Sequence, residues 1–144
     1  MGCDIQIHIE VKFAGQWQHY SQFKGDRIYQ LFAKMAGVRN SDEFYVEPLS
    51  PPKGLPADIT FLTDYDNKHW GSDAHSHSYL NAAEIAQLAE WTRSPDRTRR
   101  FDDNCFWFDR YFGYLYRQGF DDFAKCPDEF PGLEDLRFVF WFDN

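Results

Sequence analysis

The chain has 144 residues, with 15 basic and 23 acidic side chains and a formal net charge of −8. This length fits one domain with a buried core, so we expect a single domain over residues 1–144. The acidic balance argues against long nucleic acids as partners, because their affinity comes from Lys and Arg that neutralise phosphates. No apolar run approaches the ~18 residues of a spanning helix, so no membrane partner is expected.

Two further features of the composition bear on location and packing. Cys3, Cys105 and Cys126 are odd in number and far apart, which fits neither a disulfide framework nor a zinc ribbon and favours a reducing cytoplasm. The chain also has 15 Phe, 8 Tyr and 5 Trp. We assign most of these aromatic residues to the core and to an interface between subunits of a homo-oligomer, and two or three to stacking on a ligand.

The first elements are predicted from periodicity. Strict alternation predicts a strand over residues 4–11, with isoleucines on one face and polar side chains on the other. Residues 13–16 form a turn, and residues 17–20 are the partner strand of a hairpin. Asp26 then caps a helix that runs from about Arg27 to Ala36 and ends at Gly37.

The later elements complete the fold class. Residues 38–60 are expected to form a long proline-rich loop, and Asp64, Asp66, Asn67 and Gly71 to mark a second loop. An extended segment over 75–80 precedes a helix that begins at Asn81, and a further helix, or a strand, is expected at 104–118. Alternation predicts a last strand over 136–142. The sum is an α+β fold, with a small, mostly antiparallel sheet that includes the N-terminal hairpin and the C-terminal strand, and about three helices packed on it.

Two extended segments contain clustered histidines. The polar face of the opening strand presents Asp4, Gln6, His8 and Glu10, a pattern that a solvated sheet face would also produce. In the segment from Asp73 to Tyr79, an extended chain places His75 and His77 on one face. Such a pair can chelate a metal, act as general acid and base, or donate hydrogen bonds to phosphate and ribose oxygens. No cofactor and no metal are favoured, although a divalent metal remains an alternative.

A third group follows the first helix. Arg39 is a candidate fork for a phosphate, and Asn40 a partner for a base or ribose. A surface arginine that compensates the helix dipole would give the same pattern. Arg27 and Tyr29 begin the same helix and are placed to approach the same pocket, and Trp70 or Tyr79 is a candidate for stacking on the ligand.

Four motifs together resemble a family of small proteins common in phages and prophages. They are Met1–Ile5, the segment Ala36–Asn40, Gly54–Pro56 and His75–Leu80. The resemblance covers roughly residues 1–90. A His commonly follows the opening Gly-Cys-Asp-Ile in that family, whereas this chain has Gln6, which retains hydrogen bonding but not proton transfer. The resemblance implies a phage accessory protein in the cytoplasm of an infected bacterium, and by analogy one that counters bacterial immunity.

Three functional hypotheses follow. The favoured one is a binding protein that sequesters a small nucleotide-derived immune signal, either a cyclic dinucleotide or an ADP-ribose derivative. Its expected ligand-binding residues are Asp4, Gln6, His8, Arg39, Asn40, Trp70, His75, His77 and Tyr79. The first alternative is a phosphodiesterase that cleaves such a signal with His75, His77 and Asp4 as catalytic residues. The second is an interaction module that blocks a host factor through the acidic, aromatic C-terminal third.

Overall fold

A computed structural model of the chain describes residues 2–25, 27–43, 45–93 and 132–144. In this part, four antiparallel strands form one sheet in the order β2-β1-β4-β3. The strands are β1 (Asp4–Phe13), β2 (Gln16–Gly25), β3 (Ala74–Asn81) and β4 (Leu133–Asp143). The last strand along the chain therefore lies inside the sheet, between the first strand and β3.

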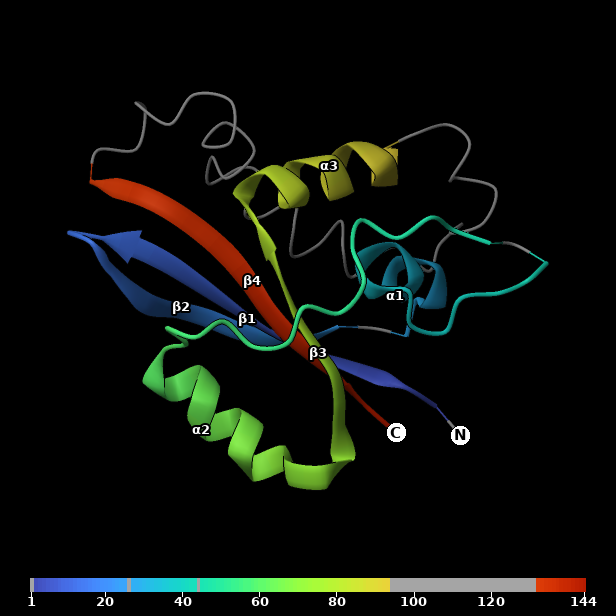
Figure 1. Cartoon of the computed structure of the whole chain (residues 1–144), viewed down its shortest axis with the longest axis horizontal. Coiled ribbons are helices and arrows are strands. Elements are labelled where there is room, and N and C mark those ends of the chain that lie inside the picture. Colours follow the sequence, from blue (N-terminus) through green and yellow to red (C-terminus); the bar gives the residue numbers. More distant parts are fainter. Residues whose placement is uncertain (1, 26, 44, 94–131) are drawn as a thin grey trace.

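The helices cover both faces of this sheet. Helices α1 (Tyr29–Ala36) and α3 (Ala82–Arg93) lie on one side, and α2 (Phe61–Trp70) lies on the other, followed by the 3-10 turn η1 (Gly71–Asp73) (Figure 1). The predicted α+β class, with an antiparallel sheet and three helices, is confirmed. None of the described helices is long and apolar enough to cross a membrane.

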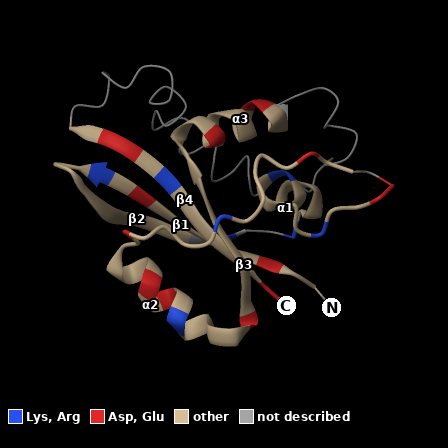
Figure 2. Ribbon diagram, viewed as in Figure 1, with Lys and Arg blue, Asp and Glu red and all other residues tan. Residues whose placement is uncertain are grey.

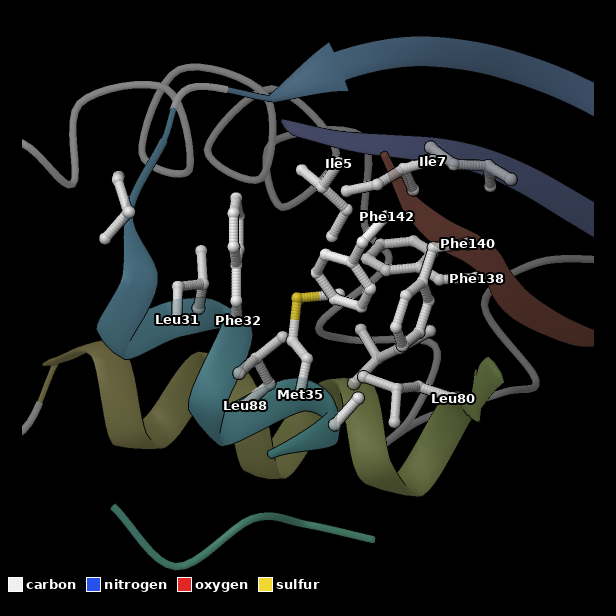
Figure 3. Packing of buried hydrophobic residues seen from close by; sticks show 14 of the residues in the cluster. Ile5, Ile7, Leu31, Phe32, Met35, Leu80, Leu88, Phe138, Phe140 and Phe142 are labelled. Carbon is white, nitrogen blue, oxygen red and sulfur yellow. The ribbon is translucent and has the colours of Figure 1, made fainter. Parts of the chain in front are cut away.

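The hydrophobic core lies between the sheet and the pair α1 and α3. The apolar sides of β1 and β4 face Phe32 and Met35 of α1 and Leu88 of α3 (Figure 3). The strand contribution comes from Ile5, Ile7, Ile9, Val11, Leu136, Phe138, Phe140 and Phe142. Alternation in both strands produces this surface, so the predicted apolar faces of residues 4–11 and 136–142 are confirmed.

Local signals fix several element ends as expected. Ala14 and Gly15 form the two-residue hairpin loop with φ of 49° and 74°, the left-handed geometry that fits the twist of a tight hairpin. Gly37 ends α1 in the left-handed conformation. At α3, the Glu84 N–H donates to the Asn81 side chain at 2.9 Å while the Asn81 N–H donates to the Glu84 carboxylate at 3.1 Å, a capping box.

Two predictions about elements differ from the structure, and two others are not tested by it. The expected loop at residues 64–71 is mainly α2. Helix α1 begins at Tyr29 rather than near Arg27, with Ile28 at the N-cap and no side-chain cap. Asp26, the expected cap, and the expected helix at 104–118 lie outside the described residues.

The proline-rich loop protects one edge of the sheet. The Gly54 N–H donates to the His77 carbonyl at 2.8 Å, and the Lys53 N–H donates to the Ser78 hydroxyl at 3.1 Å. These bonds place the loop along β3, the strand at that edge. The loop therefore satisfies the His77 carbonyl, a backbone group that an edge strand would otherwise expose.

Candidate functional site

Helix α2 presents its polar side to the sheet and its apolar side to solvent. Thr63 is buried and Asp66 and Asn67 are half-buried against the sheet, whereas Phe61 and Tyr65 are 78% and 66% exposed. The sheet face beneath α2 is accordingly polar, and both Lys or Arg and Asp or Glu segments colour β1 and β4 in Figure 2. On the polar side of the opening strand, His8 and Glu10 are therefore buried under a helix, whereas Asp4 and Gln6 remain partly exposed.

Glu10 anchors the start of α2 to the sheet. Its carboxylate is fully buried, and one oxygen accepts from the Arg137 guanidinium at 2.7–2.8 Å. The other oxygen accepts from the Thr60 N–H at 3.0 Å and from the Thr63 hydroxyl at 2.7 Å. Arg137 also donates to Asp58 at 2.7 Å. The N-cap residue of α2, Thr60, makes no side-chain cap hydrogen bond. Instead, the Glu10 carboxylate, which belongs to β1, accepts from a backbone N–H at the start of the helix.

Farther along α2, three side chains form a continuous hydrogen-bonded row that we call the histidine chain: Asp66, His8 and His19. His8 Nε2 lies 2.7 Å from Asp66 Oδ2, and His8 Nδ1 lies 2.9 Å from His19 Nε2. His8 is 1% exposed. The hairpin register pairs Glu10 with His19, and the bulge that follows, with Tyr20 as the extra residue of β2, places His8 opposite Gln22.

The hydrogen bonds assign the protons in the histidine chain. An ionised Asp66 only accepts, so His8 Nε2 carries a proton, and in a neutral His8 ring Nδ1 then presents a lone pair. His19 Nε2 must then donate to that lone pair. In neutral His19 this leaves Nδ1 as the free basic nitrogen at the end of the row.

Trp141 separates two histidines on this face. Its fully buried ring stacks on His8 with centroids 5.2 Å apart, and lies 5.9 Å from His77. His77 Nε2 is 2.7 Å from Asn67 Oδ1, so the ring donates to the amide oxygen. The Trp141 Nε1–H has no hydrogen-bond partner among the described residues. His8 and His77 therefore share one face, as expected, but α2 occupies the space above them.

Burial shapes the titration of these groups. Burial lowers the pKa of His19, with the neighbouring His8 as the next cause, while Glu10 and Asp66 act in the opposite direction. Burial likewise lowers the pKa of His77, and His75 adds to the effect. Both rings are consequently held in the neutral form at neutral pH, which suits a hydrogen-bond acceptor at His19 Nδ1.

A second candidate site lies beside α1, where Lys and Arg segments gather in Figure 2. This arginine pocket has a volume of about 270 Å³. It is lined by Arg27, Tyr29, Gln30, Ala33, Arg39, Asn40, Ser41 and Val46. The prediction that Arg27, Tyr29, Arg39 and Asn40 approach one pocket is confirmed.

Neighbouring groups fix the two guanidinium groups of the arginine pocket. Arg27 donates to both carboxylate oxygens of Asp4, at 2.6 and 3.3 Å, and Lys24 lies 3.2 Å from the same carboxylate. The hydrogen bond from Arg27 is the main cause that lowers the pKa of Asp4. The Arg39 guanidinium lies 5.5 Å from the Tyr29 ring centroid, a cation–π arrangement, and the Tyr29 hydroxyl accepts from the Cys3 N–H at 3.1 Å.

Asn40 has a structural role beside this pocket. Its amide nitrogen donates to the Val46 carbonyl at 2.7 Å, and its oxygen accepts from the N–H groups of Ser41 and Val46. These bonds close the loop that follows α1. The expected contact of Asn40 with a base or ribose would therefore use the second N–H of its amide nitrogen.

The remaining expected ligand residues do not converge. The His75 ring stacks near Phe142, on the core side, while His77 lies near Trp141 on the α2 side. Ser76 has φ of 54° within a register shift between His75 and Ser78, and this irregularity breaks the alternation. The prediction that His75 and His77 share a face is therefore wrong, and the proposed catalytic set with Asp4 is not assembled.

The other expected ligand-binding residues are Gln6, Tyr79 and Trp70, and the first two contact other residues of the fold. Gln6 donates to Asp143 at 2.9 Å. The Lys53 ammonium lies 4.6 Å from the Tyr79 ring centroid, and Trp70 is the half-buried last residue of α2. The expected single hollow bounded by the opening strand and the histidine segment is thus replaced by α2, and the arginine pocket lies beside α1, on the other side of the sheet (Figure 1).

Two alternatives remain from the sequence: a metal site, and an interaction module in the C-terminal third. Among the described residues, no group of three or more His, Cys, Asp or Glu side chains is arranged to hold a metal ion. Of the acidic, aromatic C-terminal third, residues 101–131 lie outside the described part, and Leu136–Phe142 is buried in the sheet. Comparisons of the chain with protein-family models, curated proteins and solved structures find no match.

Proposed function

We propose that the chain binds a small phosphate-bearing, nucleotide-derived molecule in the arginine pocket. The observation that carries this proposal is the presence of Arg27, Arg39 and the Tyr29 ring around one cavity of about 270 Å³. Guanidinium groups form bidentate, charge-assisted hydrogen bonds with phosphate oxygens, and these are among the stronger hydrogen bonds in proteins. The bonds from Arg27 Nε and Nη2 to Asp4 hold this guanidinium group in place before the ligand binds, and its other N–H groups would contact the phosphate.

The lining favours capture over cleavage. None of the described residues that line the arginine pocket is a His, Asp or Glu, the most common general acids and bases, and the hydroxyl of Tyr29 already accepts from the Cys3 N–H. The charges of its two arginines stabilise a bound phosphate but do not activate water. We therefore propose that the ligand is held intact, which is the behaviour of a protein that sequesters a signal.

The size of the pocket bears on the ligand class. Sites for drug-sized ligands occupy roughly 300–1,000 Å³, so this cavity accommodates a phosphate with part of its sugar. The rest of an ADP-ribose derivative or a cyclic dinucleotide would lie outside it, against the surface or a second protomer. Capture of such a molecule, in the anti-defence role that the phage resemblance implies, belongs to the same proposal.

Calorimetric titration tests the proposal with inorganic phosphate, ADP-ribose and a cyclic dinucleotide as ligands. Arg39 is exposed, so Arg39→Gln should leave the fold intact and weaken binding roughly tenfold or more, since a hydrogen bond to a charged group contributes about 1.5–3 kcal/mol. Lys68→Gln on α2 is the matched control, because its ammonium pairs with Asp64 on the outside of the helix. Equal affinity of the Arg39 variant and the parent would reject the pocket.

Recovery of the ligand separates capture from cleavage. The loaded protein is denatured by heat, and the released molecule is identified by mass spectrometry. We expect the intact ligand in stoichiometric amount. A released product of altered mass would show that the chain is an enzyme and would overturn the sequestration proposal.

A further inference from the structure

The segment Gly2–Asp4 adjoins the arginine pocket, although its residues are not among the described residues that line the cavity. Cys3 anchors this segment. The Cys3 N–H donates to the Tyr29 hydroxyl at 3.1 Å, and the Cys3 side chain is fully buried in the core. Because Tyr29 lines the pocket, this bond holds the residues on either side of Cys3 next to it.

Asp4 fixes one edge of the Arg27 guanidinium. Its carboxylate accepts from Nε at 2.6 Å and from Nη2 at 3.3 Å. The Arg27 side chain is 56% exposed, so without this pairing it would sample several rotamers. A guanidinium group has five N–H donors in a planar fork, and the pairing leaves those of Nη1 and one of Nη2 for a phosphate.

Gly2 places the same guanidinium by having no side chain. A Cβ built on Gly2 would overlap Nη1 and the central guanidinium carbon of Arg27, and it would lie 2.7 Å from Nη2. The guanidinium is the end of a flexible side chain, so it can move away from an added methyl group at little cost to the fold. Its present position beside Asp4 therefore depends on a residue without a Cβ at position 2.

The two acidic residues near Arg27 differ in how they act on it. The hydrogen bond to Asp4 is the main cause that raises the pKa of Arg27, whereas Asp143 contributes through its charge alone. Asp143 accepts instead from Gln6 at 2.9 Å. Both carboxylates repel an incoming anion, but of the two it is Asp4 that orients the guanidinium.

We propose that Gly2 and Asp4 are positioning residues of the arginine pocket, which set its affinity for phosphate by holding the Arg27 guanidinium before the ligand binds. This inference rests on the proposed function, because it concerns the affinity of the same pocket. A guanidinium that is ordered in the fold loses little further side-chain entropy upon binding. The N-terminal segment thereby regulates the pocket, since its displacement weakens binding without any change in the lining residues.

Gly2→Ala tests the role of the missing side chain. Inorganic phosphate, ADP-ribose and a cyclic dinucleotide are titrated into the full chain by calorimetry. We expect a native circular dichroism spectrum and roughly tenfold weaker binding, the effect of losing one hydrogen bond to a charged group. In an Arg27→Gln background the same substitution should have no further effect, because the displaced group is absent. A loss that persists in this background would overturn the positioning role of Gly2.

Asp4→Ala separates orientation from electrostatics by the sign of its effect. Removal of a negative charge strengthens anion binding, whereas loss of orientation weakens it. We expect roughly tenfold weaker binding. Asp143→Ala is the matched control, because it removes a neighbouring charge that does not orient Arg27, and it should bind as tightly as the parent or slightly more tightly. Unchanged or tighter binding by Asp4→Ala would overturn the role of Asp4.

The outcomes separate this inference from the proposed function. If the parent binds none of the three ligands, both are rejected. If the parent binds and Arg39→Gln binds more weakly, while Gly2→Ala and Asp4→Ala bind like the parent, the pocket is retained and the positioning role is rejected. NMR of the ligand-free chain gives a second measurement: the Arg27 Nε–H signal should be protected from exchange with water in the parent and lose that protection in both variants. Equal protection in all three would contradict the proposal.

Discussion

The sheet face under α1 and α3 is almost wholly apolar, whereas the face under α2 contains His8, Glu10, Arg137 and Trp141. On the first face, stability comes from non-directional burial, and residues of similar shape can replace one another at modest cost. On the second face, each buried polar group depends on a particular partner, and its loss leaves another group unsatisfied. The histidine chain belongs to this second, more demanding face.

The largest expected difference between the faces concerns Glu10. Glu10→Ala removes the buried partner of Arg137, which keeps only the largely exposed Asp58, so the free energy of unfolding should fall by about 3–5 kcal/mol. On the same strand but the opposite face, Ile7→Val should cost about 0.5–1.5 kcal/mol. Urea denaturation at pH 7 measures both. If the two variants lose equal stability, the carboxylate does not anchor α2.

A polar interaction at the surface of the apolar side should matter less. Asn81→Ala removes the side chain that accepts from the Glu84 N–H, and we expect a loss of about 1 kcal/mol in the free energy of unfolding. Asn81 is exposed, so water replaces the lost partner in part. Gln87→Ala, also exposed on α3, is the control and should stay within about 0.5 kcal/mol of the parent. A loss as large as that of Glu10→Ala would remove the distinction between buried and exposed polar pairs.

The elements that could be predicted are those with local signals. The alternating isoleucines and phenylalanines define β1 and β4, and the Asn81–Glu84 pair defines the start of α3. The arginine pocket was also within reach, because Arg27 and Arg39 flank one short helix. In each case the interacting residues are close in sequence or the pattern repeats at a fixed period.

Helix α2 and the histidine chain could not be predicted in this way. The inner side of α2 is polar and its outer side includes Phe61, Leu62 and Tyr65, the reverse of the usual amphipathic pattern. Asp66 meets His8 across 58 positions in the sequence. The sequence offered one indication of which residues pair between β1 and β2, the tight hairpin loop. In such a hairpin, two residues at the same distance from the loop lie opposite one another. That register pairs Glu10 with His19, but the bulge beyond this pair, with Tyr20 as the extra residue of β2, places His8 opposite Gln22.

Acid should weaken the α2 face specifically. The pKa of His77 is lowered in the folded protein, so between that value and about 6.5 the unfolded chain binds more protons. The free energy of unfolding therefore decreases as the pH falls below about 6.5, and His19 acts in the same direction. His77→Gln should reduce the slope of stability against pH, measured by urea denaturation from pH 7 to 5. The exposed His69→Gln serves as the control, and an unchanged slope for His77→Gln would contradict this assignment.

The smallest expected effect is at Trp141, where two contributions oppose each other. Trp141→Phe removes buried ring atoms, but it also removes an Nε1–H that has no partner among the described residues, a relief of about 1–3 kcal/mol. The net change in the free energy of unfolding should lie within about 1 kcal/mol of zero, provided that stacking on His8 persists. Phe140→Leu, the neighbouring residue on the apolar face, also loses ring atoms but gains no such relief, and should cost about 1–2 kcal/mol. A greater loss for Trp141→Phe than for Phe140→Leu would show that the indole N–H is satisfied in solution, because the opposing contribution would then be absent.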